Sequence, residues 1–142
     1  MASDAHIQRI SVSADGKLVF TSDQTKPQVA VIDTVSNKIK SWIALPSLSF
    51  ATTPTPDGKW LLVAMSSANK VAIVSLATMK VDTLVEVPAA PQQILVRPDG
   101  KAAYVSCDLS QKIAVIRTSD WTVEKLMEAG PIADGLAWAV GQ

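Results

Sequence analysis

Short apolar runs alternate with polar turns along the whole chain. In one part of it, β-rich runs at 92–97, 102–107 and 112–117 are separated by a Pro-Asp-Gly-Lys turn and a polar loop. Runs of about six residues that are rich in β-branched side chains and bounded by Gly, Pro, Asp or Ser are typical of strands. Polar and apolar residues alternate at 122–127, which predicts a fourth strand, and no segment favours a helix. The pattern therefore predicts an all-β chain in which one hairpin follows another.

The same order of segments recurs at a constant interval of 42 residues. The turn occurs three times in this register, as Ala14-Asp15-Gly16-Lys17, Pro56-Asp57-Gly58-Lys59 and Pro98-Asp99-Gly100-Lys101. A strand motif keeps the same interval, as Val29-Ala30-Val31-Ile32, Val71-Ala72-Ile73-Val74 and Ile113-Ala114-Val115-Ile116. Two independent motifs in one register identify a tandem repeat.

A repeat of this length made of strands predicts β-propeller blades, which are four-stranded antiparallel sheets arranged about an axis. We expect residues 1–142 to form one partial propeller, with blades at about 6–46, 49–88 and 91–129. The third strand of each blade is apolar on both faces, so Val31, Val115 and Ile116 are expected to be buried between blades. A β-sandwich also has a strand every 8–12 residues, but nothing in a sandwich requires a constant interval.

Residues 133–140 line up with the first strand of a fourth repeat. We expect this segment to be a closing strand or one exchanged with another molecule, with Leu136 and Trp138 buried by strand pairing. Three blades make an incomplete ring, and its two end faces are expected to expose side chains such as Val29, Val31, Ile113 and Val115. Soluble monomers rarely expose large apolar patches. Either a larger propeller supplies the missing blades, or copies of the chain associate.

Composition limits the partners of the chain. Hydrophobic residues make up 48% of it, and 13 basic residues balance 13 acidic ones. Without a net positive charge, nucleic acid is not an expected partner on electrostatic grounds, and no run of about 20 apolar residues predicts a membrane span. The N-terminus has no signal peptide pattern. The single cysteine, Cys107, lies in a strand pattern and is expected to be a buried, inert thiol.

Candidate chemistry is sparse. Asp23, Asp108 and Asp134 are expected on the loops of one face, at the axial mouth, where carboxylates could bind a hard cation such as Ca²⁺. The alternative is that these aspartates make Asx turns. His6 is the only histidine and lies near a terminus, and the four tryptophans occupy different phases of the repeat, which favours packing over a shared ligand cage. We therefore expect no catalytic residues, no bound metal and no cofactor.

The repeats resemble those of the YVTN-type β-propeller family of bacterial and archaeal surface-layer and periplasmic proteins. Ala102-Ala103-Tyr104-Val105-Ser106 is similar to the strand that names the family, and Gly130-Pro131 is similar to its junction between blades. Val29-Ala30-Val31-Ile32-Asp33-Thr34 followed by Ser36-Asn37-Lys38 is also close to the family's pattern. The departures are Ala14, which replaces proline, and Ser75 and Arg117, which replace aspartate.

The resemblance implies a parent protein in the periplasm or outside the cell. It also implies two classes of function, because relatives of the family include propellers without known activity as well as lactonase-like hydrolases and a lyase. The leading hypothesis is a non-catalytic binding or scaffold module that works with copies of itself or with further blades. The alternative is part of a propeller enzyme whose site lies at the axial mouth.

Overall fold

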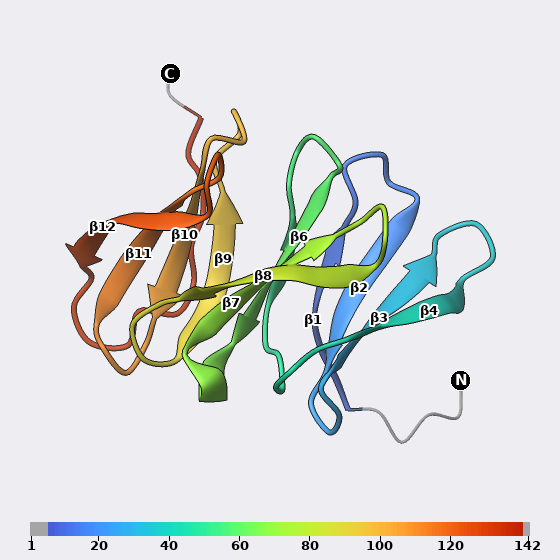
Figure 1. Cartoon of the computed structure of the whole chain (residues 1–142), viewed down its shortest axis with the longest axis horizontal. Coiled ribbons are helices and arrows are strands. Elements are labelled where there is room, and N and C mark those ends of the chain that lie inside the picture. The colour runs from blue at the N-terminus through green and yellow to red at the C-terminus, as the bar shows by residue number, and fades with distance from the viewer. Residues whose placement is uncertain (1–5, 141–142) are drawn as a thin grey trace.

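The computed structural model describes residues 6–140, which fold into three four-stranded antiparallel sheets, as predicted (Figure 1). Blade 1 contains β1 (Ile7–Val12), β2 (Leu18–Asp23), β3 (Gln28–Asp33) and β4 (Lys38–Ala44). Blade 2 contains β5 (Thr52–Pro54), β6 (Trp60–Met65), β7 (Lys70–Ser75) and β8 (Lys80–Glu86). Blade 3 contains β9 (Pro91–Val96), β10 (Ala102–Cys107), β11 (Lys112–Arg117) and β12 (Thr122–Glu128).

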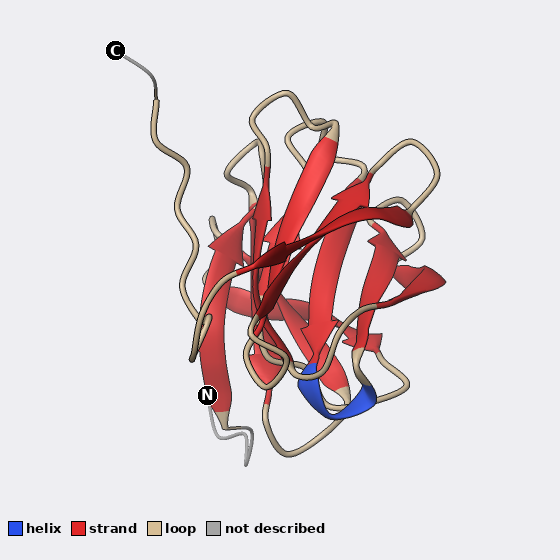
Figure 2. Cartoon of the chain, turned by 90° about the vertical axis from the view of Figure 1, so that its left-hand side faces the viewer, coloured by secondary structure: helices blue, strands red, loops and turns tan. Residues whose placement is uncertain are grey.

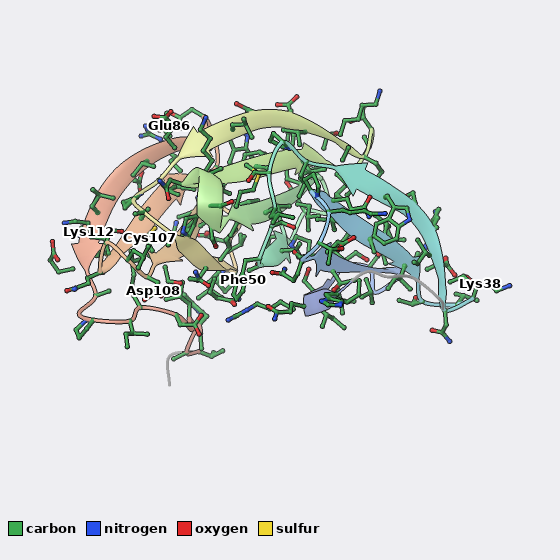
Figure 3. The ribbon with its side chains drawn as sticks, turned by 90° about the horizontal axis from the view of Figure 1, so that it is seen from below. Lys38, Phe50, Glu86, Cys107, Asp108 and Lys112 are labelled. Atoms are coloured by element: carbon green, nitrogen blue, oxygen red, sulfur yellow. The ribbon has the colours of Figure 1, made fainter. Side chains whose placement is uncertain are left out.

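The strands of each sheet follow chain order, and each is paired antiparallel to the next. The sheets fan out as an arc, with β4, β8 and β12 along its convex edge (Figure 3). On the inner side β1 contacts β5, and β5 contacts β9. This arrangement is an incomplete β-propeller, as the repeat predicted. Residues in β4 alternate between exposed and covered positions, because successive side chains of a strand point to opposite faces of the sheet.

Two differences from the predicted elements are small. The first strand of blade 2 is limited to Thr52–Pro54. It ends at the same repeat position as β1 and β9 but begins later than they do. A single 3-10 turn, Ser66–Ala68, follows β6 where no helical residue was predicted. It leads into Asn69, whose φ of 53° lies in the left-handed region that Asn tolerates better than most residues.

The hairpin turns explain part of the repeat chemistry. Gly16, Gly58 and Gly100 all have φ of 73°, a conformation that suits glycine because it has no Cβ. The aspartate before each glycine accepts a hydrogen bond from the amide of the following lysine, at 2.9–3.0 Å. These Asp-Gly-Lys segments therefore set the turn geometry and hold each hairpin in register.

Two hydrophobic clusters join the blades. We call the side of a blade that faces the next blade in the chain its forward face, and the opposite side its rear face. Between blades 1 and 2, the forward face of blade 1 packs on the rear face of blade 2 through Phe20, Val29, Val31 and Ile43 against Leu61, Val63, Met65, Ala72 and Val74. Between blades 2 and 3, the equivalent residues are Leu62, Val71, Ile73 and Val85 against Ala103, Val105, Cys107, Ala114 and Ile116. One interface is thus built twice from the same repeat positions.

This arrangement confirms one expectation and corrects another. Val31 and Ile116 are fully buried between blades, as expected. Val115 is only 5% exposed, but it lies on the forward face of blade 3, on which no other blade of the described residues packs. The expectation that Val29, Val31 and Val115 would be exposed on the end faces is wrong. Val29 and Val31 belong to the forward face of blade 1, which blade 2 covers. Sequence patterns did not reveal which alternate residues of a strand point to which neighbour.

Residues 133–140 do not form the predicted strand. They form an extended segment without regular secondary structure (Figure 2). Contacts of Asp134 with Ser106 and of Trp138 with Tyr104 place it beside blade 3, where Trp138 is 46% exposed and Leu136 is partly covered. A strand needs a hydrogen-bonded neighbour, and the described residues place none next to this segment. Two features still follow the repeat. Ile132 has φ of 58°, like Ala90 one repeat earlier with 61°, and Ser106 Oγ donates a 2.6 Å hydrogen bond to the carbonyl of Asp134.

Candidate functional site at the axial face

The inner side of the arc carries a small polar cluster built around Arg9. The register of β1 against β2 shifts between Gln8 and Ile10, and Arg9 at this bulge has φ of 50°. Bulges with unusual dihedral angles often redirect a side chain near functional sites. Here the redirected side chain is a guanidinium that reaches from blade 1 to blade 3.

The Arg9 guanidinium has three partners. Its Nη1 donates a 2.6 Å hydrogen bond to Gln93 Oε1 of β9, and its Nη2 forms a 3.0 Å ion pair with Asp134 Oδ1. The same group lies 4.6 Å from the centre of the Phe50 ring, within the range of a cation–π contact. Phe50 lies on the inner side of the arc (Figure 3). Arg9 thus joins both ends of the arc across its inner side.

A shallow pocket of about 140 Å³ lies next to this cluster. Its walls are Gln24, Leu48, Ser49, Phe50, Ser66 and Ser67. Gln24 Nε2 donates a 2.7 Å hydrogen bond to the Ser49 carbonyl, while the buried Ser49 hydroxyl has no hydrogen-bond partner among the described residues. The pocket therefore combines serine and glutamine side chains with the apolar side chains of Leu48 and Phe50, and the Phe50 ring also contacts the Arg9 guanidinium. Such a mixed lining suits a small ligand that carries both apolar and hydrogen-bonding groups.

The structure separates the three predicted aspartates. Asp23 is fully buried and makes an Asx turn: its Oδ1 accepts hydrogen bonds from the Thr25 amide at 2.8 Å and from the Thr25 hydroxyl at 2.7 Å. Asp108 is half-buried at the start of the loop between β10 and β11 (Figure 3). Asp134 forms an ion pair with Arg9. Among residues 6–140, no group of three His, Cys, Asp or Glu side chains is placed to hold a metal ion.

The remaining candidates take part in packing. Burial raises the pKa of the Cys107 thiol to about 11, so the thiol is protonated at neutral pH. His6 is exposed just before β1. Trp60 and Trp121 form an edge-on pair between blades 2 and 3, with ring centres 5.6 Å apart. Arg9 was not among the predicted site residues, because the bulge that redirects its side chain leaves no recognisable pattern in the sequence.

Asp23 gives a testable pH dependence. Burial pushes the pKa of its carboxyl upward, but hydrogen bonds from Thr25, Gln28 and Lys26 outweigh that effect and hold the pKa at about 2. Because this value is lower than in the unfolded chain, Asp23 stabilises the fold above about pH 4, and this contribution is lost as the pH falls through 2.

We expect Asp23→Asn to lower the free energy of unfolding by about 1–3 kcal/mol at pH 7, and by less near pH 2. Urea unfolding measures this, with the exposed Asp82→Asn as the control. Equal stability of Asp23→Asn and the original chain at pH 7 would contradict the assignment.

Within residues 6–140, no helix is long and apolar enough to cross a membrane.

Comparison with known proteins supports the fold. No family model and no curated protein matches the chain. Hydrazine synthase of Kuenenia stuttgartiensis superimposes with a TM-score of 0.87 and 26% identity, over 94% of this chain and 39% of that one. A functionally unknown protein of Desulfotomaculum acetoxidans gives a TM-score of 0.81 at 18% identity, over 93% of this chain and 45% of that one.

U3-55K gives a TM-score of 0.83 at 13% identity, over 94% of this chain and 42% of that one. The chain therefore spans well under two thirds of each of these structures. Hydrazine synthase and U3-55K are β-propeller proteins. The three sheets of this chain are β-propeller blades, and they form an incomplete ring.

Proposed function

We propose that the chain is a non-catalytic binding or scaffold module, an arc of a YVTN-type β-propeller whose two end faces are covered by further blades. The partner is the remainder of a larger propeller or, when the chain is isolated, a second copy of itself. The repeat motifs support the YVTN assignment and, with it, a parent protein in the periplasm or outside the cell. The shallow pocket next to the Arg9 cluster is where such a propeller would hold a small ligand.

The observation that carries this proposal is a contrast between equivalent positions. Ile10 on the rear face of blade 1 is 70% exposed, whereas Ile94, two repeats later, is 1% exposed against blade 2. On the forward face of blade 3, Met127 is 38% exposed, whereas its equivalent Ile43 in blade 1 is fully buried. Ile10 and Met127 are thus uncovered at the ends of the arc, whereas their equivalents inside it are covered. Burial of these apolar surfaces favours association with a blade-like partner.

Residues 133–140 also favour a further blade after blade 3. Ser106 and Arg9 hold Asp134 beside β10, where the first strand of a following blade would lie. Trp138 packs at a tilt on Tyr104 of the forward face, with ring centres 6.4 Å apart. In our proposal this segment becomes the inner strand of a fourth blade when a partner supplies the neighbouring strands.

The test is the mass in solution, measured by light scattering across micromolar concentrations. We expect the mass to rise with concentration, because the end faces of one copy cover those of another. The double variant Ile10→Glu/Val12→Glu should remain a monomer, since it places two charges on the rear face of blade 1, where these residues are 70% and 50% exposed. Leu109→Glu is the matched control, as Leu109 is 78% exposed on a loop away from that face. A monomer at every concentration, or equal association of all three proteins, would overturn the proposal.

A further inference from the structure

An open pocket on the forward face of blade 3 has a counterpart inside the chain. It has a volume of about 420 Å³, and its walls include Arg97, Lys101, Ala102, Arg117 and Glu124. We call it the Ala102 socket. Ala102 and Arg117 are paired across β10 and β11. The socket therefore lies where β10 begins, at the Asp-Gly-Lys end of the blade.

The positions equivalent to Ala102 receive a side chain from the next blade in both internal interfaces. Trp60 is one repeat before Ala102, and Trp121 of blade 3 packs edge-on against it with ring centres 5.6 Å apart. Leu18 is two repeats before Ala102. It packs on the same hydrophobic cluster as Met79 of blade 2, and the two line one pocket. Each of these two blades thus receives a large side chain from the blade that comes after it.

The inserted residues share one backbone conformation. Met79 and Trp121 both have φ of 56° and lie in the turn between the third and fourth strands of their blades. Asn37 is the equivalent residue of blade 1, with φ of 55°. Bulky residues rarely adopt this left-handed conformation. In this conformation the turns of blades 2 and 3 present Met79 and Trp121 to the preceding blade.

We propose that the Ala102 socket is the receptor for this turn of a following propeller blade, and that it selects a blade with a large aromatic side chain at the turn position. The inference rests on the proposed function, because it needs a blade to cover the forward face of blade 3. Its occupant is defined by chemistry: an aromatic side chain on the turn between the third and fourth strands.

Size and charge support an aromatic occupant. Ala102 is much smaller than Leu18 or Trp60, so the incoming side chain has more space to fill. Arg97 Nε lies 2.8 Å from Asp99 Oδ1, and Arg117 Nη2 lies 3.0 Å from Asp120 Oδ2, so both guanidinium groups are held in place. Guanidinium planes pack well on aromatic rings. Asn37 of a second copy is too small to fill the socket, and therefore the chain itself is a poor occupant.

The test introduces a tryptophan at the turn position of blade 1, so that a second copy of the chain can insert an aromatic side chain into the Ala102 socket. Asn37→Trp places in blade 1 the residue that the equivalent turn of blade 3 already carries. We expect it to strengthen self-association at least about tenfold over the original chain, as measured by analytical ultracentrifugation. In the associated state, β1 of the incoming copy and residues 133–140 would occupy the same position beside β10, so one of them must be displaced. The free-energy cost of this displacement is the same for all variants and cancels in the comparison.

Two variants identify the socket as the cause. Val35→Trp adds the same side chain to the same turn, at a position that is 87% exposed, and should leave association unchanged. Ala102→Glu combined with Asn37→Trp fills the socket with a carboxylate beside the two arginines, and should return association to the original level. Circular dichroism shows whether each variant is folded.

The outcomes separate the two proposals. If the original chain associates through its end faces but folded Asn37→Trp associates no more tightly than Val35→Trp, the socket is wrong and the proposed function stands. If every variant stays monomeric, both proposals are wrong. If Ala102→Glu leaves the gain from Asn37→Trp intact, the tryptophan acts elsewhere and the socket is again overturned.

Discussion

Ile73→Asp is expected to leave no soluble, folded protein. Ile73 is fully buried in β7, the third strand of the middle blade, and belongs to the cluster that joins blades 2 and 3. An unpaired carboxylate there loses its hydration without gaining a partner, a cost of several kcal/mol on top of the lost apolar burial. A domain of ordinary stability has only about 5–15 kcal/mol to lose.

Soluble yield, circular dichroism and thermal unfolding check this prediction. Val35→Asp is the matched control, because it introduces the same charge at a position that is 87% exposed, and it should behave like the original chain. An Ile73→Asp protein with the original spectrum and melting temperature would show that the space between blades 2 and 3 admits water.

The repeat made the architecture predictable from the sequence. The interval of 42 residues places the same turn and the same apolar strand in each blade, and the runs expected at 102–107 and 112–117 agree with β10 and β11 to the residue. The information is local and redundant: an Asp-Gly-Lys turn sets each hairpin, and a β-branched third strand fills each interface. Three copies of one signal are harder to misread than a single copy.

The sequence did not reveal which faces lie open. Val29 and Ile113 occupy the same position of the repeat, yet the first is covered by blade 2 and the second belongs to an uncovered face. Their environments differ because a blade packs on the forward face of blade 1, whereas none of the described residues forms a blade beyond blade 3. The same is true of residues 133–140, whose sequence fits a strand but which have no neighbouring strand within residues 6–140 with which to pair.

The candidate site was the least predictable part. Arg9 is a single arginine in a strand of mixed polar and apolar residues, and its role depends on a bulge and on partners such as Gln93, which lies 84 residues away in the sequence. Asp23 was a plausible ligand by residue type, but its carboxylate is engaged by hydrogen bonds of the local turn. Long-range geometry, which one sequence does not show, decides the case of Arg9. Local hydrogen bonds of an Asx turn, the alternative that the sequence already offered, decide the case of Asp23.

The central claim is that the end blades are half-covered versions of the middle blade. It is tested most directly by the free energies of unfolding of three equivalent truncations. Phe20 and Leu62 occupy the forward faces of blades 1 and 2 and are fully buried, whereas Tyr104 occupies the forward face of blade 3 and is partly covered, in contact with Trp138. The truncations are Phe20→Ala, Leu62→Ala and Tyr104→Ala.

The measurement is urea unfolding at a concentration at which the chain is monomeric. We expect Phe20→Ala to cost about 3–5 kcal/mol and Leu62→Ala about 2–5 kcal/mol, because each leaves a cavity between two blades. Tyr104→Ala should cost about 1 kcal/mol, because no blade covers its face. A loss for Tyr104→Ala as large as that for Leu62→Ala would contradict the account, since it would mean that the forward face of blade 3 is already covered.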